Sequence, residues 1–348
     1  TSVVDLSVSG TSNLGANVTT TGTQTYSDAV TLSGGDRTLQ GSTVNFGNAI
    51  TGTGSDDLII TGALDLDGAL TSVVDLSVSG TSNLGANVTT TGTQTYSDAV
   101  TLSANVTLTT TDNGNITLND TINGDYNLTI STHGTGDTTF TEAVGGTAAL
   151  NNISISTDVL TAAAIKADGT LSVTNLNAST ISGIISQGTA LALTKAGAGS
   201  LTLSAANTFT GDTTISAGDL AIGGSGQLGG GSYGGAISIA TGSTFTYASS
   251  ANQILSGIIS GTGAVTKSGT STLTLTGTNT YIGTTTISAG VLKLGDNSTT
   301  GTINNSPITN NSQMILDFSA DTTISSDISG TGTLSVTARY YEFYDSGS

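Results

Sequence analysis

Residues 201–223 read LTLSAANTFTGDTTISAGDLAIG, and residues 273–295 read LTLTGTNTYIGTTTISAGVLKLG. The two stretches are copies of one pattern, so that Leu273 repeats Leu201 and Gly295 repeats Gly223. Within each copy, apolar residues alternate with Thr, Ser or Lys, which is the two-residue period of short half-buried strands. Such strands cannot bury a face alone, so the long fixed period predicts a solenoid in which each rung packs on its neighbours.

A second repeat lies at the other end of the chain, where residues 1–33 return unchanged as residues 71–103. If a rung takes about 23 residues, near the short end of known repeat lengths, the offset between these blocks corresponds to about three rungs. One rung size then serves both halves, and the chain holds roughly fifteen rungs. We therefore expect an all-β fold of the right-handed parallel β-helix, or β-solenoid, type.

The predicted core consists of stacked aliphatic side chains. We expect Leu201, Leu203, Ile215, Leu220 and Ile222 to be buried, each related to its partner in the second copy. Triplets with Thr or Ser between two apolar residues predict further buried strands at 106–108, 116–118, 128–130, 153–155, 171–173 and 237–239.

Two segments depart from the strand pattern. Residues 161–168 (TAAAIKAD) favour a helix, but eight residues are too few for a stable helix, so we expect a loop or a single turn. Residues 223–235 are rich in glycine and predict a flexible loop at the side of the rod.

The charge composition excludes several partners. The chain has 24 acidic and 6 basic residues and a net charge of −18, whereas phosphate backbones and anionic lipids attract clustered Lys and Arg. We therefore expect no nucleic-acid partner. No apolar run approaches the ~18 residues that span a bilayer, so no membrane span is expected. The absence of cysteine is compatible with export.

Residues 181–223 and 255–295 resemble the autotransporter-associated β-strand repeat of bacterial passenger domains. The resemblance rests on residues 260–263 (SGTG), Thr266 and Lys267, 273–275, 279–281, Gly283 and 287–290 (ISAG). Residues 136–146 (GDTTFTEAVGG) resemble the looser strand repeats of filamentous-haemagglutinin-type surface proteins. The resemblance implies a right-handed parallel β-helix on the bacterial cell surface.

This resemblance also sets the expected organisation. Residues 1–180 form the N-terminal solenoid repeats, residues 181–337 continue the same solenoid with autotransporter-type repeats, and residues 338–348 form an aromatic tail. The implied function is an extracellular structural or adhesive β-solenoid without catalytic activity, such as a stalk, an adhesin passenger or a fibre subunit. Its expected partners are other copies of the chain, and a host surface, an environmental surface or a glycan receptor.

A polysaccharide-active β-helix enzyme is the first alternative. Its candidate carboxylates are Asp56, Asp57, Asp65 and Asp67. Glycoside hydrolysis needs two carboxylates across a substrate groove, and aromatic platforms and basic groups for positioning are scarce here. We expect these residues on solvated strands and turns. Structural calcium remains an open alternative for an acidic solenoid, although the glycine-rich calcium nonapeptide is missing. No cofactor is expected.

An ice-binding solenoid is the second alternative, suggested by residues 21–25 (TGTQT) and 284–286 (TTT). An ice-binding face needs the same Thr positions on almost every consecutive rung. In the sequence the Thr positions shift between repeats, so we expect exposed Thr that reflects β-propensity only.

Two further motifs carry no predicted chemistry. His133 has no second His or Cys with which to share a metal, and we expect it in an exposed turn. Residues 224–229 (GSGQLG) match the dinucleotide-binding glycine spacing, but no βαβ unit surrounds them.

The sequence also leads to expectations about the two ends of the chain. Thr1 begins inside a repeat, and a third C-terminal copy starting at Ile324 stops after one strand, so both ends are expected as cuts within a longer solenoid. The tail contains Tyr340, Tyr341, Phe343 and Tyr344. Clustered exposed aromatics mark contact surfaces, so we expect an assembly contact that joins rods head to tail. A truncated or misassigned segment is the open alternative.

Overall fold

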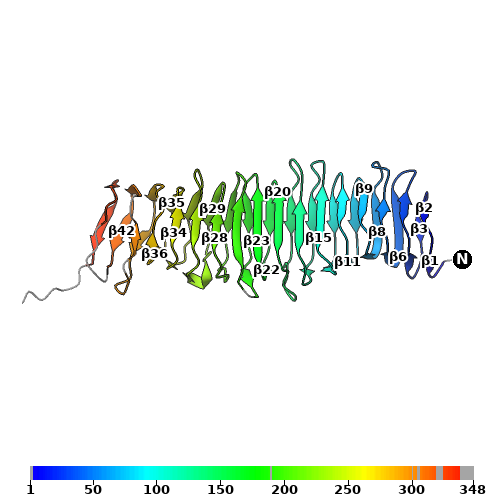
Figure 1. Ribbon diagram of the computed structural model, residues 1–348, viewed down its shortest axis with the longest axis horizontal. Coiled ribbons are helices and arrows are strands. Elements are labelled where there is room, and N and C mark those ends of the chain that lie inside the picture. The colour runs from blue at the N-terminus through cyan, green and yellow to red at the C-terminus, as the bar shows by residue number, and fades with distance from the viewer. Residues whose placement is uncertain (1–2, 189, 300, 304–305, 319–323, 338–348) are drawn as a thin grey trace, which may run out of the picture.

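The computed structural model describes residues 3–188, 190–299, 301–303, 306–318 and 324–337. These residues form a rod of about 16 coiled turns (Figure 1). The strands run across the rod and pair in parallel with strands of the preceding and following rungs, so the hydrogen bonds between rungs run along its axis. The all-β class and the parallel β-solenoid are therefore confirmed.

Most complete rungs contribute one strand to each of three faces of the rod, and two rungs contribute only an isolated bridge residue, Val144 or Ala206, to face 1. Face 1 comprises β1 (Leu6–Val8), β4 (Gln24–Tyr26), the second halves of β6 (Arg37–Phe46) and β8 (Leu58–Leu66), β11 (Ser82–Leu84), β14 (Val100–Leu102), β17 (Ile122–Asn123), β22 (Ile165–Ala167), β25 (Ile185–Gln187), β30 (Ser232–Tyr233), β33 (Gln253–Leu255), β36 (Thr272–Leu275), β39 (Val291–Leu294), β42 (Gln313–Leu316) and β44 (Thr333–Val336).

Faces 2 and 3 follow in chain order within every rung. Face 2 comprises β2 (Ser12–Leu14), β5 (Val30–Leu32), β7 (Ile50–Thr51), β9 (Leu70–Val73), β12 (Val88–Thr90), β15 (Val106–Thr110), β18 (Leu128–Ser131), β20 (Ile153–Thr157), β23 (Thr170–Asn175), β26 (Ala192–Ala196), β28 (Thr213–Ile215), β31 (Ile237–Ile239), β34 (Ile259–Gly261), β37 (Thr278–Asn279) and β40 (Thr302–Ile303). Face 3 comprises β3 (Val18–Thr19), the first halves of β6 and β8, β10 (Leu76–Val78), β13 (Gln94–Tyr96), β16 (Ile116–Leu118), β19 (Thr138–Phe140), β21 (Leu160–Ala162), β24 (Ser179–Ile181), β27 (Ser200–Leu203), β29 (Asp219–Ile222), β32 (Thr244–Tyr247), β35 (Ala264–Lys267), β38 (Thr285–Ile287), β41 (Ile308–Asn310) and β43 (Ile328–Ser329).

The strands β6 and β8 turn the corner from face 3 to face 1 without interruption. Their register shifts between Gln40 and Thr43. Gly62 has φ +126°, and a Cβ there would lie 1.9 Å from the carbonyl oxygen of Gly41 in the rung below. Only glycine therefore fits this corner, because any side chain would push the two rungs apart.

The core is the predicted column of aliphatic side chains. Leu201, Leu203, Ile215, Leu220 and Ile222 are fully buried, and so are their counterparts in the second copy. The triplet strands also bury both apolar residues, as in β15 and β20. Alternation alone therefore identified the inward row of side chains correctly.

Two local expectations need correction. Residues 161–168 were expected to form a loop or a turn, but they contain the end of β21 and all of β22, because Leu160, Ala162, Ile165 and Ala167 are buried in the stack. Tertiary packing thus overrides helix propensity here. In residues 223–235, the expected loop includes the short 3-10 turn η1 (Gly229–Gly231), but Ser232 and Tyr233 form the strand β30.

The long repeats are out of phase with the rungs. From Leu6 on face 1, strand pairing leads to Gln24, then Val44, then Leu64, which completes three rungs. Leu76, which repeats Leu6, lies two faces further on. The offset between the identical blocks thus spans three rungs and two-thirds of a fourth, so the two blocks occupy different faces.

Candidate functional site

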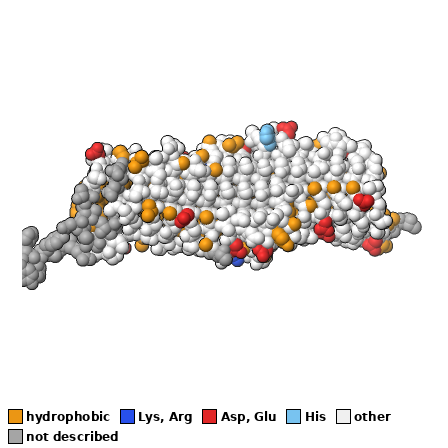
Figure 2. Space-filling model, viewed as in Figure 1, with side chains coloured by type: hydrophobic (Ala, Val, Ile, Leu, Met, Phe, Trp, Pro, Cys, Tyr) orange, Lys and Arg blue, Asp and Glu red, His pale blue; other side chains and the backbone are white. Residues whose placement is uncertain are grey.

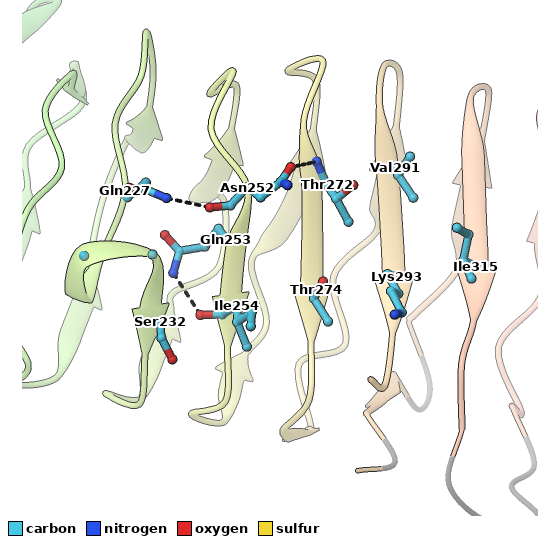
Figure 3. A pocket seen from close by; sticks show the side chains of 12 residues that line it. Gln227, Ser232, Asn252, Gln253, Ile254, Thr272, Thr274, Val291, Lys293 and Ile315 are labelled. Carbon is cyan, nitrogen blue, oxygen red and sulfur yellow. Dashed lines mark hydrogen bonds between the residues drawn. The ribbon is translucent and has the colours of Figure 1, made fainter. Parts of the chain in front are cut away.

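A groove of about 530 Å³ runs along face 1 near the C-terminal part of the rod (Figure 3). Strands β33, β36, β39 and β42 form its floor, and the glycine turn η1 borders it. It is lined by Gln227, Gly230, Gly231, Ser232, Asn252, Gln253, Ile254, Thr272, Thr274, Val291, Lys293 and Ile315.

Amide side chains fix one side of the groove. Gln227 Nε2 donates to the backbone oxygen of Asn252 at 2.6 Å, and Asn252 Oδ1 accepts from the Thr272 amide at 2.9 Å. Buried Gln253 donates to the backbone oxygens of Leu228 and Ile254, at 3.0 and 2.8 Å. These bonds hold the turn against the strands and give this part of the groove a fixed shape.

The opposite side combines an ion pair with apolar surface. Lys293 Nζ lies 2.6 Å from Asp317 Oδ2. In the same outward row, Ile315 lies next to Lys293 on one side, and on the other side Thr274 separates Lys293 from Ile254, which is 40% exposed. Apolar patches next to hydroxyls and amides suit a ligand that has both apolar and hydrogen-bonding surfaces.

The predicted acidic pairs do not lie in this groove. Asp56 is almost fully buried and accepts hydrogen bonds from Thr53 Oγ1 at 2.6 Å, Ser55 Oγ at 3.3 Å and the Gly35 amide at 3.1 Å. The bond from the Thr53 side chain is the main cause that lowers the pKa of the Asp56 carboxyl. The oxygens of the Asp56 carboxylate are therefore engaged by hydrogen bonds from the rod itself.

Asp57 belongs to a ladder of carboxylates along one corner of the rod. Its Oδ1 accepts from the Asp75 amide at 3.1 Å, while Asp36 Oδ1 accepts from the Asp57 amide at the same distance. Burial raises the pKa of Asp57, and the nearby carboxylates of Asp75, Asp36 and Asp56 add to the rise. Each carboxylate thus caps the backbone of the next rung, a common role for Asp at turns.

Asp65 and Asp67 lie elsewhere, at the face 1 end of β8. Asp65 Oδ1 accepts from Asn83 Nδ2 of the next rung at 2.8 Å. Asp67 donates its backbone amide to the Phe46 oxygen at 2.9 Å. The structure therefore separates the two candidate acidic pairs onto different faces.

The remaining motifs have structural positions. His133 is exposed in the turn before Gly136, whose amide donates to its backbone oxygen at 3.1 Å. The glycines at 224–229 lead into η1 and a strand. Across the described ranges, no cluster of three or more His, Cys, Asp or Glu side chains could hold a metal. The candidate assembly residues Tyr340, Tyr341, Phe343 and Tyr344 lie outside the described residues.

A surface that the sequence analysis missed runs along face 3. From β6 onward, an outward residue of each face 3 strand stacks on its counterpart in the next rung, and we call this row the threonine ladder. In order, it comprises Thr38, Ile59, Ser77, Thr95, Thr117, Thr139, Thr161, Thr180, Thr202, Ala221, Thr246, Thr266, Thr286, Thr309 and Ser329. The expectation that Thr positions shift between rungs is therefore wrong for this face.

Variable turn lengths hid the ladder in the sequence. The step along the chain from Thr161 to Thr180 is shorter than the step from Thr95 to Thr117, and the step from Ala221 to Thr246 is longer than both. A search at fixed spacing cannot find such a row. The apolar–Thr–apolar triplets were the usable signal, because each one places its Thr outward between two buried residues.

Two buried lysines were also missed as a structural feature. Lys195 and Lys267 occupy the same position in the two C-terminal repeats and are fully buried. Lys195 Nζ donates to the backbone oxygens of Ala196, Gly197 and Ala217, at 2.7, 2.9 and 3.2 Å. Burial lowers the pKa of each lysine to about 8. The alternation Leu193-Thr194-Lys195 was the available signal, because it places the lysine inward.

Comparison with known proteins finds a family model that matches two segments of the chain. Residues 193–222 and 265–294 match the passenger-associated-transport-repeat. The first match begins on face 2 and the second on face 3, so these copies are also out of phase with the rungs. No solved structure matches the chain.

A relative among curated proteins is the adhesin BmaC autotransporter of Brucella suis biovar 1 (strain 1330). It is 40% identical over 160 residues, which are 41% of this chain and 5% of the relative. The chain therefore corresponds to a small part of that protein's length. Together with the repeat matches, this similarity supports an autotransporter passenger-type repeat domain.

Proposed function

We propose that the chain is an extracellular segment of a bacterial surface protein, with a structural or adhesive role and no catalytic activity. The observation that carries this proposal is the long solenoid rod combined with its similarity to a protein named as an autotransporter adhesin. No helix in the described part of the chain is long and apolar enough to cross a membrane.

The length and the stiffness of the rod support a role as a stalk. About 16 rungs at the ~4.8 Å spacing of paired strands give a length of roughly 75 Å. The core is continuous along the rod, so bending would strain many interlocked rungs at once. The chain thus projects whatever it carries away from its point of attachment.

The groove on face 1 is the contact site that fits an adhesive role. We assign it a carbohydrate ligand of a host or environmental surface, because a sugar ring presents both apolar C–H faces and hydroxyls. Ile254 and Ile315 would contact the ring faces, and the amide of Asn252 would bond to hydroxyls.

Binding to a glycan array and to immobilised cells tests this proposal. Ile254→Glu places a charge in the groove, and we expect at least a tenfold loss of binding, or about 1.4 kcal/mol. Ile282→Glu is the matched control, because Ile282 is 54% exposed and is not among the groove residues. Absence of binding by the unchanged rod, or equal loss in both variants, would reject the groove as the contact site.

A further inference from the structure

The threonine ladder on face 3 is a periodic surface along almost the whole rod. Between Thr95 and Thr202, six consecutive rungs all present Thr. Four more Thr follow from Thr246 to Thr309. Paired strands repeat at ~4.8 Å, so the side chains repeat at the same interval.

The ladder hydroxyls are free to bind something outside the protein. Within the described residues, no ladder Thr side chain donates or accepts a hydrogen bond, and Thr161 and Thr180 are exposed. Thr is β-branched and stiff at χ1, so stacked copies hold their hydroxyls and methyls in a preformed array. Binding to such an array costs little side-chain entropy.

The surroundings of the ladder argue against most partners. The ladder has no charged and no aromatic member, and Arg, Tyr and Trp are the usual anchors of protein interfaces. Figure 2 shows the neighbouring side of the rod, which carries the face 2 strands such as β15, β20 and β23, and there too the surface is largely uncharged with most carboxylates near the edges. Asp57, Asp75 and Asp137 each lie two residues before a ladder position, so a second copy docked here would bring like charges together.

A regular, uncharged array of hydroxyls and methyls matches a regular lattice of water. We propose that the threonine ladder is an ice-binding surface. The rung spacing is close to the repeat of oxygen atoms along the a axis of hexagonal ice, so successive hydroxyls can hold successive lattice waters while the methyls occupy the spaces between them. Ordered water bridging such groups binds nearly as well as a direct hydrogen bond.

Ice-affinity partitioning and thermal hysteresis of the full chain test this proposal. We expect the unchanged chain to be enriched in slowly grown ice and to depress the freezing point below the melting point. The double variant Thr139→Lys with Thr161→Lys should lower its ice enrichment at least fivefold, because two long charged side chains interrupt the longest Thr run. The variant Thr101→Lys with Ser186→Lys is the control, because both residues point outward on face 1.

Melting temperatures of both double variants that equal that of the unchanged chain would show that the fold is retained. No ice enrichment of the unchanged chain would overturn the proposal, and so would equal loss in the control. Sedimentation of the same proteins tests whether the ladder is instead an interface between copies of the chain. If the unchanged chain self-associates and the Thr139→Lys and Thr161→Lys variant does not, the ladder is an interface between copies and the ice proposal is wrong.

Discussion

Tyr26 and Tyr96 occupy the same position in two identical stretches of sequence, yet they lie on different faces of the rod. Tyr26 stacks on Phe46 on face 1, with ring centroids 5.4 Å apart and an interplanar angle of 17°. Tyr96 lies on face 3 between Val78 and Leu118. In both places the hydroxyl donates to the glutamine two residues earlier, at 3.1 and 3.3 Å. The sequence therefore specifies strand and turn, whereas stacking decides the face.

Deletion of residues 34–103 should leave a folded rod. The deletion joins Ser33 to Ala104, so the first block enters the positions of its identical copy and meets the same following sequence. At ~4.8 Å per rung, the loss of nearly four rungs should shorten the rod by about 18 Å. Small-angle scattering measures this length, and a single cooperative thermal transition should remain. An aggregated or unfolded product would mean that the blocks depend on their faces.

Replacement of Leu275 by Asp should break the stack locally. Leu275 is fully buried between Leu255 and Leu294, so the variant places an unpaired carboxylate among apolar side chains. We expect a loss of about 3–5 kcal/mol in the free energy of unfolding, measured by urea denaturation. Thr278→Asp is the control, because Thr278 is exposed in the next strand and should change stability by less than about 0.5 kcal/mol.

Stability should depend on pH through the two buried lysines. Their pKa of about 8 in the folded chain lies below 10.5, so the unfolded chain binds more protons between these values. The free energy of unfolding should therefore rise with pH above 8, by on the order of 1 kcal/mol per lysine. Burial also raises the pKa of Tyr26, Tyr233 and Tyr281 from 10.0 to about 12. Stability should consequently fall again above pH 10, because the unfolded chain loses those protons first.

Urea titrations from pH 7 to pH 11 measure this profile. In a variant carrying Lys195→Met and Lys267→Met, the rise above pH 8 should disappear while the fall above pH 10 remains. The variant's absolute stability is not the test, because the substitution also removes the hydrogen bonds to backbone oxygens such as that of Gly197. A rise of equal size in the variant would assign the pH dependence to other groups.

The aromatic tail remains a prediction for assembly. Replacing Tyr340, Tyr341, Phe343 and Tyr344 together by Ser should leave the rod folded and shorten or abolish head-to-tail fibres, because the large apolar contact area is lost. Light scattering and electron microscopy measure fibre length. Deletion of residues 345–348 serves as the control, since it shortens the tail and retains its aromatics. Fibres of unchanged length in the Ser variant would rule out this contact.

The sequence predicted the inward row of side chains far better than the stacking phase. Alternation placed Leu201 and Ile155 correctly, because a two-residue period is a local property of strands. The threonine ladder depends on the sum of many turn lengths, and the unequal steps that lead to Thr117 and to Thr180 are enough to obscure it. The groove could not be predicted at all, since its walls come from different rungs.

The direction of the hydrogen bonds between rungs has a mechanical consequence. Tension applied at one end of the coil loads only the terminal rung, because each rung is bonded to its neighbours alone. The rod should then yield by peeling one turn at a time, and each turn of about 20 residues would release roughly 65 Å of extended chain. Such a shaft dissipates a sudden pull in many small steps. We therefore expect the rod to lengthen under a pulling force and to rewind when the force is removed.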